Sequence, residues 1–215
     1  LWLRREFCDE RCGLYSVGFR VRRNGSNTGA RRQCDRLDSN LQRRIVTLNR
    51  DCEARLVPTG DPITVRANHF VTLTQTLGGS FTIIVDGNMA RVAGKDADAL
   101  GLHVDPLEFP ASSKADVIDP EHIWHALRSV YDPEIPVNIA DLGLIYDVAL
   151  NTTTVSIKMT LTAPGCGMGP VLIEEVKDRV IQAPGVSSVE VELVLDPPWS
   201  RDMMSEAAQL ELGVF

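Results

Sequence analysis

Hydrophobic and polar positions alternate along the middle of the chain, over about residues 45–109. In residues 71–77 every second residue is a threonine, and a Gly-Gly pair at 78–79 then leads into a hydrophobic run at 80–85. A period of two is typical of a β-strand, and a two-residue glycine turn joins antiparallel strands. The pattern therefore predicts a hairpin within a small β-module of meander or barrel-like form. Its other predicted elements are a turn at 58–62 between two short strands, a turn at 86–88, a strand at 89–92 and one helical turn at 95–100.

The pattern becomes helical after a predicted linker at 109–114. Asp119 is a good N-cap residue, Pro120 suits the first helical position, and hydrophobic residues recur every three or four positions to about Tyr131. Five elements follow in the order strand 144–150, strand 154–161, a helix from Pro170, strand 188–195 and helix 203–210. We therefore predict an α+β fold: a small N-terminal β-module, then an α/β domain over 115–215 ordered helix–strand–strand–helix–strand plus a C-terminal helix.

Residues 1–44 show neither period and are predicted to form a disordered extension. This segment carries 11 arginines against 5 acidic residues, whereas the rest of the chain has 11 basic and 24 acidic residues. Its cysteines, Cys8, Cys12 and Cys34, lack a fourth ligand at zinc-site spacing. We interpret them as incidental rather than as metal ligands.

Composition narrows the function classes. The chain has 215 residues, of which 44% are hydrophobic, and no apolar run approaches the length of about 20 residues that crosses a bilayer. The formal net charge is −7, and the acidic character of the part after residue 44 argues against nucleic-acid binding. Five scattered cysteines do not form a disulfide framework, and no secretory signal is evident. We expect a cytoplasmic protein that binds neither nucleic acid nor membrane.

A glycine-rich loop presents Cys166 shortly before the predicted helix at Pro170. Unpaired N–H groups and the helix dipole favour an anion near a helix N-terminus, so a thiolate, the form that attacks electrophiles and binds soft metals, is stabilised there. The alternative is a small buried residue in a tight turn, which is the commoner state of an isolated cysteine. The residue types alone leave both interpretations open.

Two sequence motifs, one before Cys166 and one that contains it, bear on this question. Residues 132–146 are Asp-Pro-Glu-Ile-Pro-Val-Asn-Ile-Ala-Asp-Leu-Gly-Leu-Ile-Tyr, and residues 159–168 are Met-Thr-Leu-Thr-Ala-Pro-Gly-Cys-Gly-Met. With the strand between them they strongly resemble the MIP18 or DUF59 family, over about residues 117–200. Upstream, Arg-Asp-Cys-Glu-Ala at 50–54, Leu-Gly-Gly-Ser-Phe-Thr at 77–82 and Gly-Lys-Asp-Ala-Asp-Ala-Leu-Gly at 94–101 resemble the long bacterial, SufT-type form of that family.

The resemblance implies an iron–sulfur cluster assembly or carrier factor rather than an enzyme, with Cys166 as a thiolate ligand of a transient Fe–S cluster or of iron. Its implied partners are Fe–S assembly proteins and apo-client proteins. Cys52 matches a cysteine of the long form and is a secondary thiol, for which we expect burial. Roles in the loop or in partner contact are implied for seven residues near Cys166: Asp132, Glu134, Asp141, Thr160, Thr162, Gly165 and Gly167.

One cysteine supplies only one of the four thiolates usual for a cluster. A homodimer with two facing copies of Cys166, a small thiol such as glutathione, or a client cysteine would complete the set. Two other functions stay open: a metal-free adaptor that recruits clients, and a thiol-dependent enzyme, for which the sequence shows no base beside the cysteine. We interpret His122 and His125 as solvated or structural rather than as ligands of a shared metal, because no second ligand pair accompanies them.

Overall fold

The computed structural model describes residues 43–110 and 118–214, all of which belong to one compact unit, Leu37–Phe215. Almost all of the predicted extension, with Cys8, Cys12 and Cys34, and most of the predicted linker lie outside these residues, so the predictions about them stay predictions. No helix in the described ranges is both long enough and apolar enough to cross a membrane.

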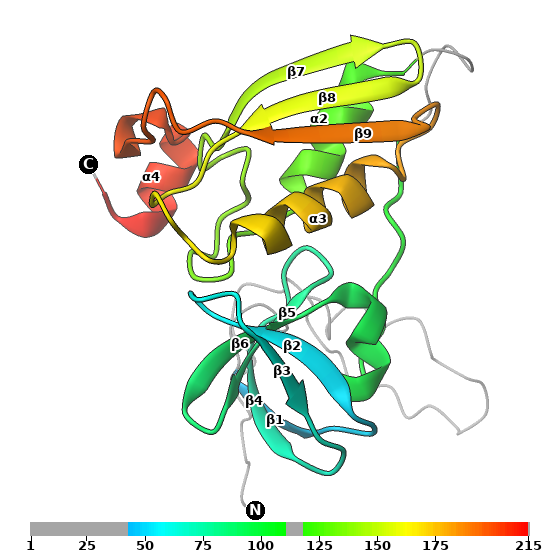
Figure 1. Ribbon diagram of the computed structural model, residues 1–215, viewed down its shortest axis with the longest axis vertical. Helices are drawn as coiled ribbons and strands as arrows, with labels where there is room; N and C mark the ends of the chain where they lie inside the picture. The colour runs from blue at the N-terminus through cyan, green and yellow to red at the C-terminus, as the bar shows by residue number, and fades with distance from the viewer. Residues whose placement is uncertain (1–42, 111–117, 215) are drawn as a thin grey trace, which may run out of the picture. The chain divides into compact units, whose positions relative to one another are not determined.

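Residues 43–110, here called the β-module, contain a six-stranded antiparallel sheet with the strand order β1-β4-β5-β6-β2-β3 (Figure 1). A 3-10 helix, η1 (Gly94–Leu100), follows the last strand. The strands are β1 (Arg44–Thr47), β2 (Cys52–Leu56), β3 (Pro62–Val65), β4 (Phe70–Gln75), β5 (Phe81–Val85) and β6 (Asn88–Val92).

The predicted hairpin is confirmed, since β4 and β5 pair antiparallel across Gly78 and Gly79. Both glycines have positive φ, 67° and 74°, a conformation that other residues adopt only at a cost. Of the predicted meander or barrel-like module, the structure shows a meander over β4, β5 and β6. Strand β1 adds to β4 at one edge, and the hairpin of β2 and β3 adds to β6 at the other. Local turn signals do not specify these long-range pairings.

Residues 118–214, here called the α/β domain, confirm the predicted α+β order (Figure 1). Strands β7 and β8 pair antiparallel, whereas β8 and β9 pair parallel because helix α3 forms the crossover between them. The elements are α2 (Pro120–Arg128), β7 (Ile145–Asn151), β8 (Thr154–Met159), α3 (Gly169–Val180), β9 (Ser188–Leu193), a 3-10 turn η2 (Arg201–Met203) and α4 (Glu206–Leu212).

Several helix boundaries differ from the prediction, and the largest differences are at the end of α2 and the start of α4. Helix α2 begins as predicted, with the Asp119 side chain accepting from the Glu121 N–H at 3.0 Å, but it ends at Arg128 instead of Tyr131. Tyr131 instead pairs with Asn138 in an isolated β-bridge. Helix α4 begins at Glu206 rather than at 203, because Ser205 caps it by accepting from the Ala208 N–H.

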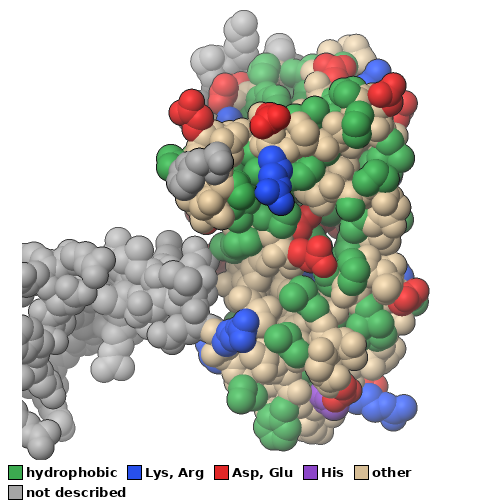
Figure 2. Space-filling view, turned by 90° about the vertical axis from the view of Figure 1, so that its left-hand side faces the viewer, with side chains coloured by type: hydrophobic (Ala, Val, Ile, Leu, Met, Phe, Trp, Pro, Cys, Tyr) green, Lys and Arg blue, Asp and Glu red, His purple; other side chains and the backbone are tan. Residues whose placement is uncertain are grey.

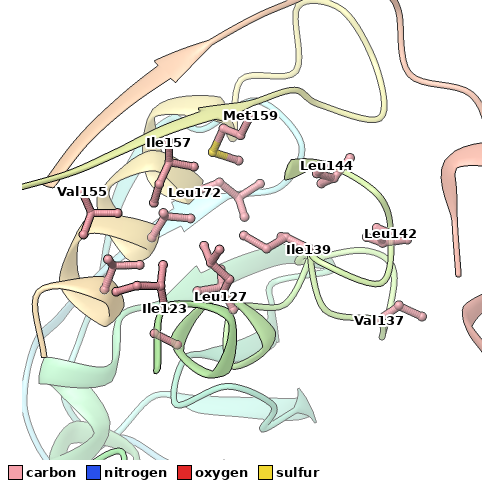
Figure 3. Close-up of a cluster of buried hydrophobic side chains, with 14 of the residues drawn as sticks. Ile123, Leu127, Val137, Ile139, Leu142, Leu144, Val155, Ile157, Met159 and Leu172 are labelled. Atoms are coloured by element: carbon pink, nitrogen blue, oxygen red, sulfur yellow. The ribbon is translucent and has the colours of Figure 1, made fainter. Parts of the chain in front are cut away.

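The hydrophobic core forms two separate clusters, one in the β-module and one in the α/β domain. In the α/β domain, alternate residues of β8 meet Ile123 and Leu127 of α2 and Leu172 of α3 (Figure 3). A fully buried aliphatic side chain contributes about 1.5–3 kcal/mol, so this cluster is the main stabilising feature of the domain. It carries the Cys166 loop, which connects β8 to α3.

Large hydrophobic side chains also reach the surface, among them Ile45, Phe70 and Leu210. On the face drawn in Figure 2, hydrophobic side chains are scattered among polar side chains and backbone atoms and do not merge into one continuous patch. Scattered exposed hydrophobic residues are normal on a protein surface.

Candidate functional site

Cys166 lies in the loop between the end of β8 at Met159 and the start of α3 at Gly169. Its backbone N–H donates to the Ala163 carbonyl at 3.3 Å, and its carbonyl accepts from the Gly169 N–H at 3.1 Å. The side chain is partly buried against the core of the α/β domain. The sequence predicts Pro170 as the first residue of the helix, but α3 begins at Gly169, so Pro170 is its second residue. The loop thus delivers a partly exposed thiol three residues before the first residue of α3.

Cys52, the other described cysteine, lies at the start of β2 and is only 1% exposed, as expected. Its Sγ–H donates to the Glu53 carbonyl at 3.3 Å. Burial, with a smaller contribution from Asp96, raises the pKa of the Cys52 thiol to about 11. Cys52 belongs to the core of the β-module and Cys166 packs on the core of the α/β domain, so the structure does not bring the two thiols into one cluster.

Two of the three acidic site candidates, Asp132 and Asp141, stabilise turns within residues 132–141. The buried carboxylate of Asp132 accepts from the N–H groups of Glu134 and Ile135, both at 2.9 Å. Asp141 pairs with Asn138 in both directions: its N–H donates to the Asn138 side chain at 2.9 Å, and its carboxylate accepts from the Asn138 amide at 2.6 Å. The Glu134 side chain is exposed. Of these acids, Glu134 has the carboxylate best placed to contact a partner.

The threonines and glycines of the loop occupy different environments. Thr160 is buried, and its N–H donates to the Leu144 carbonyl at 2.8 Å, whereas Thr162 is half-buried. Gly165 has a φ of 80° and open space where a Cβ would lie. A Cβ on Gly167, in contrast, would lie 1.9 Å from the Thr59 carbonyl oxygen. Of the two neighbours of Cys166 in sequence, Gly165 therefore faces open space, whereas Gly167 is packed against the β-module.

The contact with the β-module is reciprocal. Gly60, in the turn between β2 and β3, has a φ of 77°, and a Cβ there would lie 2.2 Å from the Gly167 carbonyl oxygen. No side chain separates the two backbones at this point, so Gly60 and Gly167 are each required for the close approach. The turn of the β-module therefore supports the residue that follows Cys166.

A second contact joins the β-module to the loop after α2. Three side chains of the sheet donate to three consecutive carbonyls: Arg91 to Tyr131 at 2.9 Å, Gln75 to Asp132 at 3.3 Å and Thr82 to Pro133 at 3.5 Å. The donors are cross-strand neighbours, because Thr82 pairs with Arg91 in one direction and with Gln75 in the other. The β-module thus contacts both family motifs, the first at Asp132 and Pro133 and the second at Gly167.

Arg91 is the centre of this interface and is only 3% exposed. Its Nη2 donates to both carboxylate oxygens of Glu175 on α3, at 2.9 and 3.0 Å, and Ser80 Oγ donates to the same carboxylate at 2.6 Å. Sequence reasoning missed these residues. Arg91 lies between Ala90 and Val92, so alternation places it on the face opposite the core of the β-module, where solvent would be expected.

His122 takes a structural position: it is buried, and its Nε2 lies 2.8 Å from the Pro110 carbonyl oxygen, whereas His125 is exposed. Both rings meet the Phe109 ring at an angle, tilted for His122 and edge-on for His125. Across residues 43–110 and 118–214, no group of three or more His, Cys, Asp or Glu side chains is arranged to hold a metal ion.

We expect iodoacetamide to modify Cys166 well before Cys52 in the folded, reduced protein, because Cys166 is partly exposed and Cys52 is buried. The reaction of Cys52 should become appreciable only as the pH approaches about 11, where its thiolate forms. Peptide mass spectrometry over a pH series measures both rates, and in denaturant the two should converge. Equal rates at neutral pH in the folded protein would contradict the burial of Cys52.

Comparisons with known proteins cover this part of the chain. Residues 120–193 match the family model described as iron–sulfur cluster assembly protein. A Porphyromonas gingivalis protein named Fe-S protein maturation auxiliary factor is 51% identical over 94 residues, which are 43% of this chain and 90% of that protein. The Bacillus subtilis protein named Fe-S protein maturation auxiliary factor YitW is 44% identical over 95 residues, 44% of this chain and 93% of its own. The Staphylococcus aureus protein named Fe-S protein maturation auxiliary factor SufT is 44% identical over 86 residues, 40% of this chain and 98% of its own. More than half of this chain lies outside each of these alignments.

Proposed function

Because the chain belongs to the iron–sulfur cluster assembly protein family, we propose that it helps to mature iron–sulfur client proteins, with Cys166 as the thiolate that holds a cluster or its iron in transit. The names of its relatives, which describe maturation auxiliary factors, support this function. The observation that carries the role of Cys166 is its partial exposure in the matched region, whereas Cys52 is buried.

The chemistry of the donor set supports the same assignment. Iron–sulfur clusters prefer thiolate ligands, and carboxylates are hard ligands suited to other ions. The carboxylates of Asp132 and Asp141 are already engaged by backbone and amide N–H groups, which supports a role in shaping the loop rather than in binding metal. Cys166 is then the ligand, and Thr160, Thr162, Gly165 and Gly167 form its loop. Asp132 and Asp141 shape the separate turns of residues 132–141.

A single thiolate per chain can hold a cluster only if further thiolate ligands come from elsewhere. The missing thiolates come from a second copy of the chain across a two-fold axis, from a small thiol, or from a cysteine of the client. Each arrangement leaves the cluster exchangeable, which suits a carrier rather than an enzyme that turns over a substrate. We further propose that its partners are assembly proteins and apo-clients, met through exposed groups such as Glu134. A cytoplasmic location fits the free thiols of Cys52 and Cys166.

Anaerobic reconstitution with iron and sulfide tests this proposal. The wild type is expected to gain visible absorbance and to retain iron and sulfide after desalting, whereas Cys166→Ser should retain neither. Cys52→Ala is the matched control, and it should load like the wild type because Cys52 belongs to the core of the β-module. Full loading of Cys166→Ser, or its undiminished support of client maturation, would favour the metal-free adaptor instead.

A further inference from the structure

A cleft of about 690 Å³ lies between the β-module and helix α3. Its walls include Ala54 on β2, Ala93 before η1, and Val171 and Glu174 on α3, and Gly167 of the Cys166 loop forms part of its lining. Small-molecule sites in proteins typically have volumes of about 300–1,000 Å³, so this cleft has the size for a small molecule.

The buried charges in this cleft do not balance. Arg91 and Arg179 both line it and are 3% and 8% exposed, while Glu175 is the carboxylate paired with Arg91. Arg179 donates to the Gly78 carbonyl, but no carboxylate of the described residues lies within ion-pair distance of its guanidinium. The Nη1 of Arg91 is also buried and without a hydrogen-bond partner in the described part.

A buried cation without an anion is costly, and an incoming carboxylate offsets that cost. Burial lowers the pKa of Arg179, which reports the same poor solvation. The exposed lining is net acidic, because its four acidic residues, Glu53, Asp105, Glu174 and Asp178, outnumber the two exposed basic residues, Arg55 and Lys95. A ligand with a carboxylate for the buried arginines and an ammonium group for the exposed acids matches both parts of the cleft.

We propose that this cleft binds a small zwitterionic thiol of the peptide class and that the end lined by Gly167 brings its sulfur toward Cys166. The identity of the ligand as a thiol rests on the proposed function, in which Cys166 needs further thiolates to hold a cluster. The recognition of its charged ends rests on the cleft alone. The β-module then supplies one wall of a binding site, in addition to supporting the loop.

Isothermal titration of the cluster-free full chain with reduced glutathione tests the proposal. Saturable binding is expected, with S-methylglutathione binding similarly, because the charged ends are recognised. Ala93→Trp fills the cleft without removing a hydrogen bond and should abolish binding, whereas Ala149→Trp, at an exposed position on β7 outside the cleft, should not.

Charge variants test the ligand class. Arg179→Gln removes a charge-assisted contact, so its dissociation constant should rise about tenfold or more. Because Arg179 also binds Gly78, the exposed Glu174→Lys provides a second variant, expected to weaken binding relative to Glu192→Lys on β9. Thermal unfolding verifies that each variant is folded.

The two proposals fail in different ways. Absence of saturable glutathione binding to the wild type, or equal binding by Ala93→Trp and Ala149→Trp, would overturn the cleft inference while leaving cluster loading of Cys166 intact. Binding of glutathione by a wild type that loads no cluster would leave the zwitterion site standing and remove the proposed function.

Discussion

Replacing Arg91 by methionine is expected to lower the free energy of unfolding by about 3–5 kcal/mol, the cost of removing one partner of a buried ion pair. The substitution keeps much of the aliphatic stem but leaves the Glu175 carboxylate with Ser80 as its remaining hydrogen-bond donor. It also removes the donor to the Tyr131 carbonyl. Because a domain is stable by only about 5–15 kcal/mol, the loss should be evident in urea or thermal unfolding.

Two controls separate burial from the mere presence of an ion pair. The double variant Arg91→Met with Glu175→Leu should be more stable than Arg91→Met alone, because no buried charge is left unpaired. Arg50→Met removes two ion pairs, with Asp96 at 3.0 Å and Asp98 at 2.6 Å, but the Arg50 side chain is 44% exposed. We expect it to change stability far less than Arg91→Met, since solvent weakens exposed pairs. Comparable losses in the two single variants would contradict the special role of the interface.

The elements of this fold could largely be predicted because their signals are local. The glycines at 78–79 supply the positive φ of a hairpin, and Asp119 caps a helix by accepting an N–H two residues later. The ends of elements were harder to predict. Helix α2 ends at Arg128, and Tyr131 forms a β-bridge with Asn138 instead. The spacing of hydrophobic residues does not predict this contact.

The support of the candidate site could not be predicted, for the same physical reason. Arg91 and Glu175 are 84 positions apart, and a polar residue that alternates with hydrophobic ones in a strand is equally consistent with a solvent-facing side chain. Its burial depends on the α/β domain covering that face of the sheet. For Cys166, the residue types left a buried and an exposed state open, and the resemblance identified the loop without specifying the backbone that packs on Gly167.

Substituting Gly60 by alanine is expected to destabilise the protein and to release the Cys166 loop. An alanine at a φ of 77° costs about 1–2 kcal/mol for the left-handed conformation alone. Its Cβ would also lie 2.2 Å from the Gly167 carbonyl oxygen, so the turn between β2 and β3 must move away from the loop. Such overpacking typically adds about 1–3 kcal/mol. Cys166 should then be alkylated faster, because the residue after it loses its support.

Gly87→Ala is the matched control, since Gly87 has a φ of 81° and no atom within 4 Å of the position of a Cβ. Gly87→Ala carries the same conformational cost but does not affect the Cys166 loop. The difference in unfolding free energy between the two variants therefore isolates the contact with Gly167. We expect Gly87→Ala to leave the alkylation rate of Cys166 unchanged. Gly167→Ala, whose Cβ would meet the Thr59 carbonyl oxygen at 1.9 Å, should resemble Gly60→Ala from the other side of the interface. If Gly60→Ala and Gly87→Ala were equally stable and showed the same Cys166 reactivity, the β-module would not support the loop, and the exposure of Cys166 would be a property of the α/β domain alone.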